Sequence, residues 1–269
     1  MAYTLWQIDA FANQPLEGNP AGVIALTAPM EAGLMQAIAR ENNLAETAFF
    51  VPAGNGRYDL RWFTPGGEVD LCGHATLASA WLVFAELAPQ LETVTFATRS
   101  GDLTVTRSAD GLTMSLPADP PSPFAAPDGY AQAVGDALGI VPPTELHSAR
   151  YLVGVWDDPE TIRAIKDCGE IARVLRQQDF WGLAVTARGD GDYDFVSRFF
   201  APDKGVPEDP VTGSSHCILT PFWARRLGKK TMKARQVSPR GGDLIATDDG
   251  ARTILTGRCA LYLKGEIFV

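Results

Sequence analysis

The chain contains one internal repeat, and this repeat constrains the fold more than any other feature of the sequence. The segment LAETA at Leu44–Ala48 returns as LAVTA at Leu183–Ala187. Three residues that follow it recur at one constant spacing, namely Arg61, Phe63 and Pro65 as Arg198, Phe200 and Pro202. A glycine then opens a helix-like stretch in each half, CGHATLASAW and TGSSHCILTPFW. Because the order is kept and the spacing is about half of 269 residues, we infer two similar domains that arose by duplication.

The segment PADPPSPFAAPDG, residues 117–129, marks the boundary between the halves, because its prolines resist both helix and sheet ladder. We expect an N-terminal half over 1–117 and a C-terminal half over 118–269, and the last strand, about 258–269, could pack on the N-terminal half. The helix-like stretch after Gly73 is apolar on all faces, which is typical of a buried helix. Short alternating strands surround it, and regular strand–helix alternation is missing. This order predicts an α+β fold in which a curved, mostly antiparallel sheet wraps a central helix in each half.

Charge and composition argue against several classes of protein. The chain has 23 Lys and Arg against 32 Asp and Glu, a net charge of −9, so we expect no nucleic-acid or membrane partner. The basic residues Arg225, Arg226, Lys229 and Lys230 are interpreted as a solvated helix end. The first residues, MAYTLWQIDAF, show no signal-peptide pattern, and the four cysteines lack CxxC spacing. These patterns predict a cytoplasmic protein with reduced thiols.

Glu46 is the strongest catalytic candidate. It lies between a helix end and an apolar strand in ENNLAETAFFVP, and Val185 is its counterpart in the repeat. A framework that keeps its neighbours but differs in charge indicates an asymmetric site. Burial against Phe49 and Phe50 would suit the carboxylate to proton transfer. The alternative is an exposed carboxylate at a strand edge.

The two repeat-related helix starts form a second group of candidates. Gly73 with His74, and Gly213 with Ser214, place free backbone N–H groups and the positive helix end where a carboxylate or an enolate could bind. His74 is either a proton shuttle or a satisfied polar residue. Asp209 lies in VPEDPVTGSS, where it is either a catalytic carboxylate or a cap of the following helix.

The cysteines argue against two other mechanisms. A racemase with two thiols needs a cysteine opposite Cys72, but the repeat places Thr212 there, and Cys217 falls one helical turn further on. The cysteines are therefore interpreted as buried structural residues. Their spacing with His74 and His216 matches no usual zinc pattern, so we expect no metal.

At these residues the chain resembles the PhzF-like isomerases, a family named after an enzyme of phenazine biosynthesis. The matching elements are QIDAFANQPLEGNPAGV, NLAETAFF, RWFTPGGEVDLCGHATLASAW and RFFAPDKGVPEDPVTGSSHC, and they fall in both halves. The resemblance implies the diaminopimelate-epimerase-like fold, with two pseudo-symmetric domains and a site between them. It also implies a cofactor-independent enzyme that forms a homodimer in many members. Phenazine synthesis itself is not implied.

Carried over by motif, the resemblance assigns the proton-moving glutamate to Glu46 in LAETAF. The supporting residues would be His74 in CGHATLA and Asp209 and Ser214 in EDPVTGS. Cys72 matches the first thiol position of the epimerase superfamily, where the phenazine enzyme has a cysteine-free stretch.

These observations lead to one hypothesis and two alternatives. The hypothesis is an isomerase that shifts a proton within a small carboxylate-bearing molecule, with Glu46, Asp209 and His74 as catalytic residues. Gly73, Gly213 and Ser214 would bind the substrate. We expect Asn19, Trp62 and Asp70 among the side chains that set specificity. The alternatives are an amino-acid epimerase of the same fold and a non-catalytic protein that binds a small acid.

Overall fold

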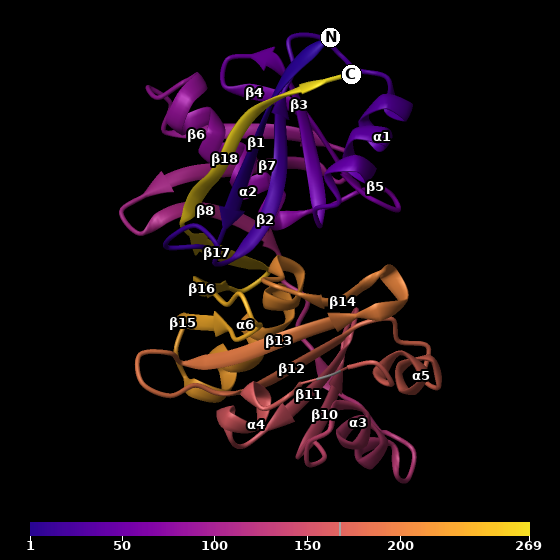
Figure 1. Cartoon of the computed structure of the whole chain (residues 1–269). Coiled ribbons are helices and arrows are strands. Elements are labelled where there is room, and N and C mark those ends of the chain that lie inside the picture. Colours follow the sequence, from indigo (N-terminus) through magenta and orange to yellow (C-terminus); the bar gives the residue numbers. More distant parts are fainter. Residues whose placement is uncertain (167) are drawn as a thin grey trace. The chain divides into compact units, whose positions relative to one another are not determined.

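The computed structural model describes residues 1–166 and 168–269, and the chain divides into two compact units. Unit 1 comprises Met1–Leu116 and Leu255–Val269, and unit 2 comprises Pro117–Ile254. The end of the chain therefore belongs with its beginning (Figure 1). None of the helices in the described part of the chain is long and apolar enough to cross a membrane.

Unit 1 is a sheet with one helix inside it and one outside. Its strands are β1 (Ala2–Ala10), β2 (Asn19–Ala25), β3 (Glu46–Gly54), β4 (Arg57–Thr64), β5 (Gly67–Val69), β6 (Thr93–Thr98), β7 (Gly101–Ser108), β8 (Gly111–Pro117) and β18 (Cys259–Phe268). Its helices are α1 (Ala32–Asn42), α2 (Gly73–Leu82) and the π-helical turn η1 (Val83–Leu87). Most strand pairs are antiparallel, while β2 with β3 and β4 with β6 are parallel.

Helix α2 lies among the strands of unit 1 (Figure 1) and packs on β1, β2, β3, β7 and β18. Its side chains are buried from His74 to Leu82, apart from the half-buried Trp81, as expected for a helix that is apolar on all faces. Its two buried hydroxyls are satisfied within the helix, because Thr76 and Ser79 donate to carbonyl groups one turn earlier. Helix α1 covers the sheet from the other side through Met35 and Ile38.

Unit 2 repeats this plan with more helices on the outside. Its strands are β9 (Ser122–Pro123), β10 (Glu145–Ser148), β11 (Leu152–Trp156), β12 (Leu183–Arg188), β13 (Phe195–Ala201), β14 (Val206–Asp209), β15 (Thr231–Gln236), β16 (Gly242–Asp249) and β17 (Arg252–Gly257), which runs on into unit 1. Its helices are α3 (Tyr130–Leu138), α4 (Pro159–Arg163), α5 (Ile171–Arg176), the 3₁₀ turn η2 (Pro202–Lys204) and α6 (Gly213–Leu227).

Helix α6 is the counterpart of α2 and packs on β15 and β16, while α3, α4 and α5 form a core with β11, β12 and β13. Pro221 lies inside α6 and has no N–H to donate to the carbonyl group of Cys217. That carbonyl instead accepts a hydrogen bond of 3.0 Å from the backbone of Asp119. The helix therefore continues through its proline without leaving a buried acceptor unpaired.

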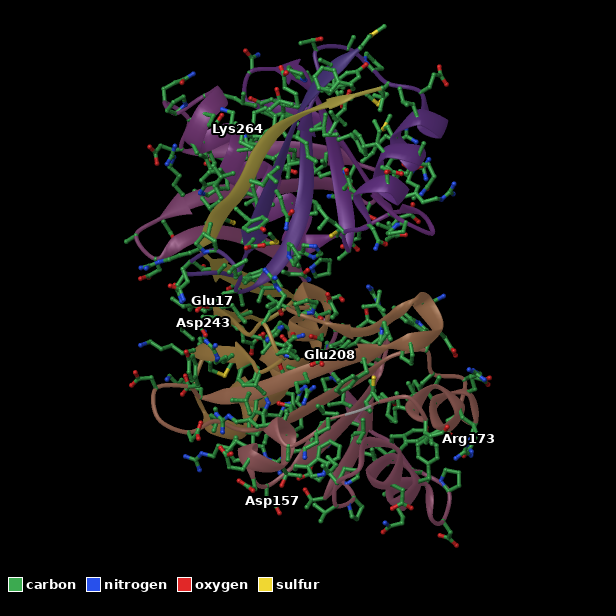
Figure 2. All side chains as sticks on the ribbon, viewed as in Figure 1. Glu17, Asp157, Arg173, Glu208, Asp243 and Lys264 are labelled. Atoms are coloured by element: carbon green, nitrogen blue, oxygen red, sulfur yellow. The ribbon has the colours of Figure 1, made fainter. Side chains whose placement is uncertain are left out.

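The duplication is visible in matching ion pairs. Arg61 binds Glu68 through two hydrogen bonds of 2.7 and 2.8 Å, and Arg198 binds Glu208 (Figure 2) at the same two distances. Each guanidinium also lies over the phenylalanine two residues later, at 5.1 Å from the ring of Phe63 and 5.4 Å from that of Phe200. Both halves thus keep one bidentate pair on equivalent strands.

The strand register corrects one detail of the repeat alignment. Phe63 lies opposite Thr47, and its repeat partner Phe200 lies opposite Leu183. The position in unit 2 that corresponds to Glu46 is therefore Gly182, not Val185. The match of LAETA with LAVTA misaligned β3 and β12. The segment between each of these strands and the arginine that follows it, Arg61 or Arg198, differs in length between the two halves. The carboxylate remains a feature of unit 1 alone.

Candidate active site

Glu46 is the first residue of β3, where the chain leaves helix α1 and enters the sheet. Asn43 ends the helix in the left-handed conformation, with φ of 49°, so that the chain can turn back toward the sheet. Ala21 of β2 is the register partner of Glu46. The Glu46 side chain is 18% exposed, so its carboxylate is held in a fixed and largely buried position.

The N-terminus of α2 brings two more polar side chains to this carboxylate. Cys72 is the extended residue just before the helix, and Gly73 is its first helical residue. The Nε2 atom of His74 lies 3.1 Å from Oε2 of Glu46, and its Nδ1 atom lies 3.5 Å from Sγ of Cys72. The His74 side chain is 7% exposed. Glu46, His74 and Cys72 therefore form one compact cluster, with the imidazole ring in contact with both other side chains.

The charges in this cluster depend on each other. Burial alone would lower the pKa of His74, but Cys72 and Glu46 outweigh it and hold that pKa well above its usual value. Burial, with the nearby carboxylate of Glu46, raises the pKa of the Cys72 thiol. Both raised pKa values mean that this cluster holds its protons to higher pH than the free thiol and the free imidazole would.

The same three residues are the candidate metal ligands of unit 1, because one donor atom of each lies within 4.8 Å of the others. His74 faces Glu46 with Nε2 and Cys72 with Nδ1. The three side chains are close enough together either to hold one ion or to pass a proton between them.

Two of the three side chains expected to set specificity are unsuited to that role. Asn19 and Trp62 have no exposed surface, because both lie on strands inside the fold of unit 1. Asp70 is different, because its side chain is 73% exposed. Its Oδ1 atom lies 3.7 Å from Nη1 of Arg99. The sequence could not separate these cases, because burial depends on which face of each strand meets the core.

Asp209 ends β14 in unit 2, and a small buried network holds it in place. The hydroxyl of Thr212 donates to Oδ2 of Asp209 over 2.5 Å. Gln236 then joins both residues: its side-chain oxygen accepts from the backbone N–H of Thr212 over 2.9 Å, and its amide nitrogen donates to the carbonyl group of Asp209. Gln236 is fully buried on β15.

Gly213 and Ser214 form the first turn of α6, directly after this network. The hydroxyl of Ser214 lies 2.9 Å from that of Tyr151, which is buried against Trp181 and Phe199. Tyr151 can therefore fix the direction in which the serine hydroxyl points. The motifs of the sequence indicated neither Tyr151 nor Gln236 as a site residue. The available signal for Gln236 was a polar residue on the apolar face of an alternating strand.

Unit 1 thus gathers Glu46, Gly73 and His74, and unit 2 gathers Asp209, Gly213 and Ser214. Cys72 joins the first set. Cys217, the other cysteine considered for a thiol mechanism, is buried within α6, and burial raises the pKa of its thiol to about 12. Its position suits packing rather than proton transfer at neutral pH.

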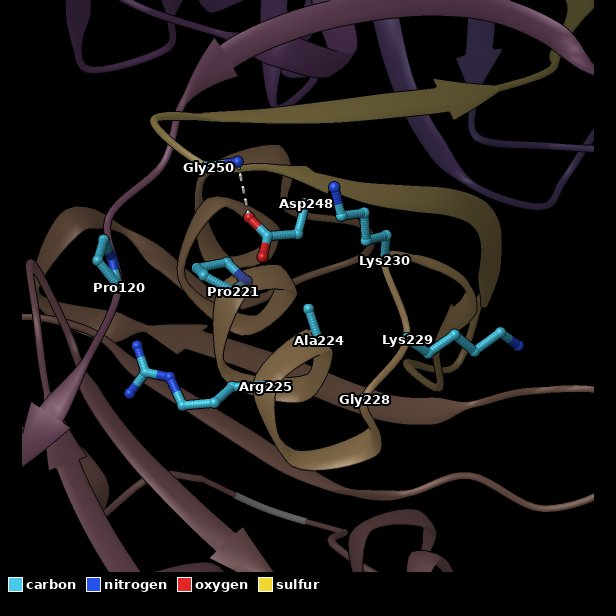
Figure 3. A pocket seen from close by; sticks show the side chains of 9 residues that line it. All are labelled: Pro120, Pro221, Ala224, Arg225, Gly228, Lys229, Lys230, Asp248 and Gly250. Carbon is cyan, nitrogen blue, oxygen red and sulfur yellow. Dashed lines mark hydrogen bonds between the residues drawn. The ribbon is translucent and has the colours of Figure 1, made fainter.

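A depression at the far end of α6 contains none of these residues (Figure 3). Arg225, Lys229 and Lys230 line it, beside Asp248, whose carboxylate accepts from the backbone of Gly250. Lys229 pairs with Asp194 at 2.8 Å. Positive side chains after the last turn of a helix are stabilised by its dipole. This supports their interpretation as a helix end rather than a binding site.

The chain is similar to known proteins over nearly its whole length. A model of the PhzC-PhzF family, the phenazine biosynthesis-like proteins, matches residues 8–265. An uncharacterized isomerase of Pseudomonas aeruginosa is 49% identical over 267 residues, which cover 99% of each chain. A solved PhzF-family structure from Enterococcus faecalis is 41% identical, with a TM-score of 0.92 and coverage of 100% of both chains.

The fold itself extends to more distant proteins. A hydroxyproline epimerase from Agrobacterium vitis matches with a TM-score of 0.63 at 12% identity, covering 99% of this chain and 92% of that one. At this identity the likeness concerns the fold alone. The fold class is therefore confirmed as the two-domain α+β fold that epimerases share. The chain belongs to the PhzC-PhzF family, which confirms the resemblance found in its motifs.

Proposed function

We propose that this protein is an isomerase that moves a proton within a small carboxylate-bearing molecule. The observation that carries the proposal is the cluster of Glu46, His74 and Cys72, in which the largely buried carboxylate lies 3.1 Å from the imidazole of His74. Membership of a family in which relatives bear the name isomerase supports the reaction type. The substrate itself is left open.

In this proposal Glu46 takes a proton from a carbon of the substrate, and the bonding electrons stay on the substrate as an enolate. The protonated Glu46 then returns the proton at another carbon, so that the composition of the molecule is unchanged. His74 contacts the carboxylate of Glu46 and holds it in position. Backbone N–H groups at Gly73 and Gly213 would bind the substrate's carboxylate and its developing charge. No step in this sequence needs a cofactor.

Asp209, Gly213 and Ser214 of unit 2 take part in the reaction only if one substrate contacts them and the residues around Glu46 in unit 1. This is part of the proposal, and it requires Asp209→Asn and Ser214→Ala in unit 2 to lower turnover. Each donor that binds the developing charge is expected to contribute roughly 3–4 kcal/mol to the barrier. The hydroxyl of Ser214 is a weaker donor, so a smaller loss is expected for Ser214→Ala.

The test measures exchange of substrate protons with solvent. Small amino acids and hydroxy acids are incubated with the protein in D₂O, and deuterium uptake is followed by mass spectrometry. Glu46→Gln keeps the shape of the side chain and removes the base, so uptake should fall by about 10²-fold or more. Glu92→Gln, which alters an exposed carboxylate, is the matched control. Uptake that survives Glu46→Gln would reject the role of Glu46, and binding without any uptake would indicate a non-catalytic protein.

Epimerisation is the second candidate, and the position of Cys72 favours it. Its sulfur lies 3.5 Å from Nδ1 of His74 and within 4.8 Å of a carboxylate oxygen of Glu46, so one cluster offers both a thiol and a carboxylate. An epimerase would use them as donor and acceptor on opposite faces of one carbon. Cys72→Ser would then abolish inversion, while Cys217→Ser would not. A Cys72→Ser variant that keeps full activity removes this candidate.

A further inference from the structure

The donor atoms of Glu46, Cys72 and His74 match the ligands of a soft divalent metal ion. In the described part of the chain, no other group of three His, Cys, Asp or Glu side chains is placed to hold a metal ion. Thiol sulfur, imidazole nitrogen and carboxylate oxygen are the ligands that zinc takes in proteins. Mg²⁺ and Ca²⁺ take oxygen ligands instead, so this set favours Zn²⁺. The sequence showed no usual zinc spacing, because the third ligand comes from β3, at a distance along the chain from the helix start.

The separation of the sulfur and the nearer ring nitrogen fits tetrahedral coordination. Sγ of Cys72 lies 3.5 Å from Nδ1 of His74. Two such ligands of one tetrahedral zinc ion, bound at about 2.3 Å and about 2.0 Å, are themselves about 3.5 Å apart. A carboxylate oxygen of Glu46 lies within 4.8 Å of the sulfur, so a movement of about 1 Å by this flexible side chain brings it to the same ion. The fourth position of such a site is open to water or to a small acid.

Two buried atoms of the cluster lack the hydrogen bonds that polar atoms in a protein interior normally form. Oε2 of Glu46 and Nε2 of His74 have no hydrogen-bond partner among the residues that the structure describes. In native proteins such atoms mark strain, a catalytic role, or a bound water or ion. An ion accounts for a carboxylate and an imidazole that meet beside a thiol. Because the Glu46 side chain keeps 18% of its surface exposed, an ion can reach it from solvent.

The second half of the chain shows that the fold does not require these ligands. Thr212 and Ser214 begin α6 at the positions where Cys72 and His74 begin α2. The same kind of helix start therefore forms without a thiol and without an imidazole. Substitutions that copy Thr212 and Ser214 into unit 1 should remove the ligands while keeping the helix.

We propose that Glu46, Cys72 and His74 together bind one Zn²⁺ ion, and that the bound ion blocks proton transfer at this cluster. Bonds form from the ion to the sulfur, to one ring nitrogen and to a carboxylate oxygen, and the protons that these groups held pass to solvent. The blocking rests on the proposed function, because a Glu46 carboxylate bound to an ion cannot take a proton from a substrate. The binding itself does not rest on it. Zinc here is a reversible inhibitor and not a cofactor of the reaction.

Titration with Co²⁺, a coloured ion that takes the same tetrahedral sites as zinc, tests the binding. The full chain is treated with a chelator, dialysed and titrated at about pH 8, because metal ligands must give up their protons. The wild type should gain the near-ultraviolet band of a cobalt–thiolate bond at one equivalent, and Zn²⁺ should abolish this band. Cys72→Thr should lose the band, and His74→Ser should weaken binding by about tenfold or more. Cys217→Ser, which alters a buried thiol outside the cluster, is the matched control and should keep the band. No band in the wild type, or a band that survives Cys72→Thr, would overturn the site.

Deuterium uptake by a substrate tests the blocking. One equivalent of Zn²⁺ should stop uptake, excess chelator should restore it, and Mg²⁺ at the same concentration should change nothing. Uptake that continues while zinc has displaced the cobalt band would overturn the blocking, and so would uptake that requires zinc. A protein that shows the cobalt band but no uptake under any condition supports the metal site and counts against the proposed function alone.

Discussion

The carboxylate of Glu46 and the imidazole of His74 lie 3.1 Å apart, although they come from different elements, the start of β3 and the first turn of α2. Neither of the two facing atoms has a well-aligned hydrogen bond to any residue in the described part of the chain. The two side chains therefore interact mainly through their charges and not through a hydrogen bond. A carboxylate held this way is ready to accept a proton that comes from outside the protein.

The contact between Glu46 and His74 predicts how the free energy of unfolding depends on pH. The pKa of His74 in the folded protein lies well above 6.5, its ordinary value, so the folded protein retains a proton that the unfolded chain releases. Its contribution to the free energy of unfolding is complete below pH 6.5 and is lost as the pH rises through the raised pKa. Urea unfolding of the wild type over alkaline pH should show this loss, and His74→Asn should lack it. The same pH slope in both proteins would contradict the assignment.

Gln236 predicts an effect at a distance from any substrate. Replacing it by leucine leaves the Thr212 N–H and the Asp209 carbonyl group without their partner, which should cost about 1–3 kcal/mol of unfolding free energy. Turnover should also fall, because the loop that positions Asp209 loosens. Gln236→Glu keeps the acceptor for Thr212 and should lose less stability. The exposed Gln177→Leu is the control, and equal stability of the Gln177 and Gln236 variants would show that the network holds nothing in place.

The sequence predicted elements better than it predicted contacts. The glycines that open α2 and α6 were visible as repeat-related positions, since a helix start has a local signature. That His74 contacts both Glu46 and Cys72 depends on how a strand and a buried helix pack, which no local pattern contains. The wrong pairing of Glu46 with Val185 has the same origin, because only the strand register identifies Gly182 as the equivalent position.

The two equivalent ion pairs, Arg198 with Glu208 and Arg61 with Glu68, should differ in what they contribute to the free energy of unfolding. The second pair therefore serves as the control for the first. The side chain of Arg198 is 6% exposed and also donates to the carbonyl groups of Ile162 and Ile165, so Glu208→Gln leaves a buried charge without its partner. We expect a loss of about 3 kcal/mol in unfolding free energy. Arg61 is 33% exposed and can be solvated instead, so Glu68→Gln should cost only about 1 kcal/mol. Equal losses in thermal and urea unfolding would show that burial does not distinguish the two pairs.

His216 should make the protein sensitive to acid. It is fully buried in α6, and burial lowers its pKa to about 4 from 6.5, while one ring nitrogen lies 2.7 Å from the carbonyl oxygen of Thr212. The unfolded chain therefore binds a proton below pH 6.5 that the folded protein refuses until about pH 4, so stability falls as the pH is lowered through this window. The total loss is roughly 3 kcal/mol. His216→Phe cannot titrate, so its unfolding free energy should fall less steeply between these pH values, even if the variant is less stable throughout. Parallel pH profiles would show that the ring is already protonated in the folded protein.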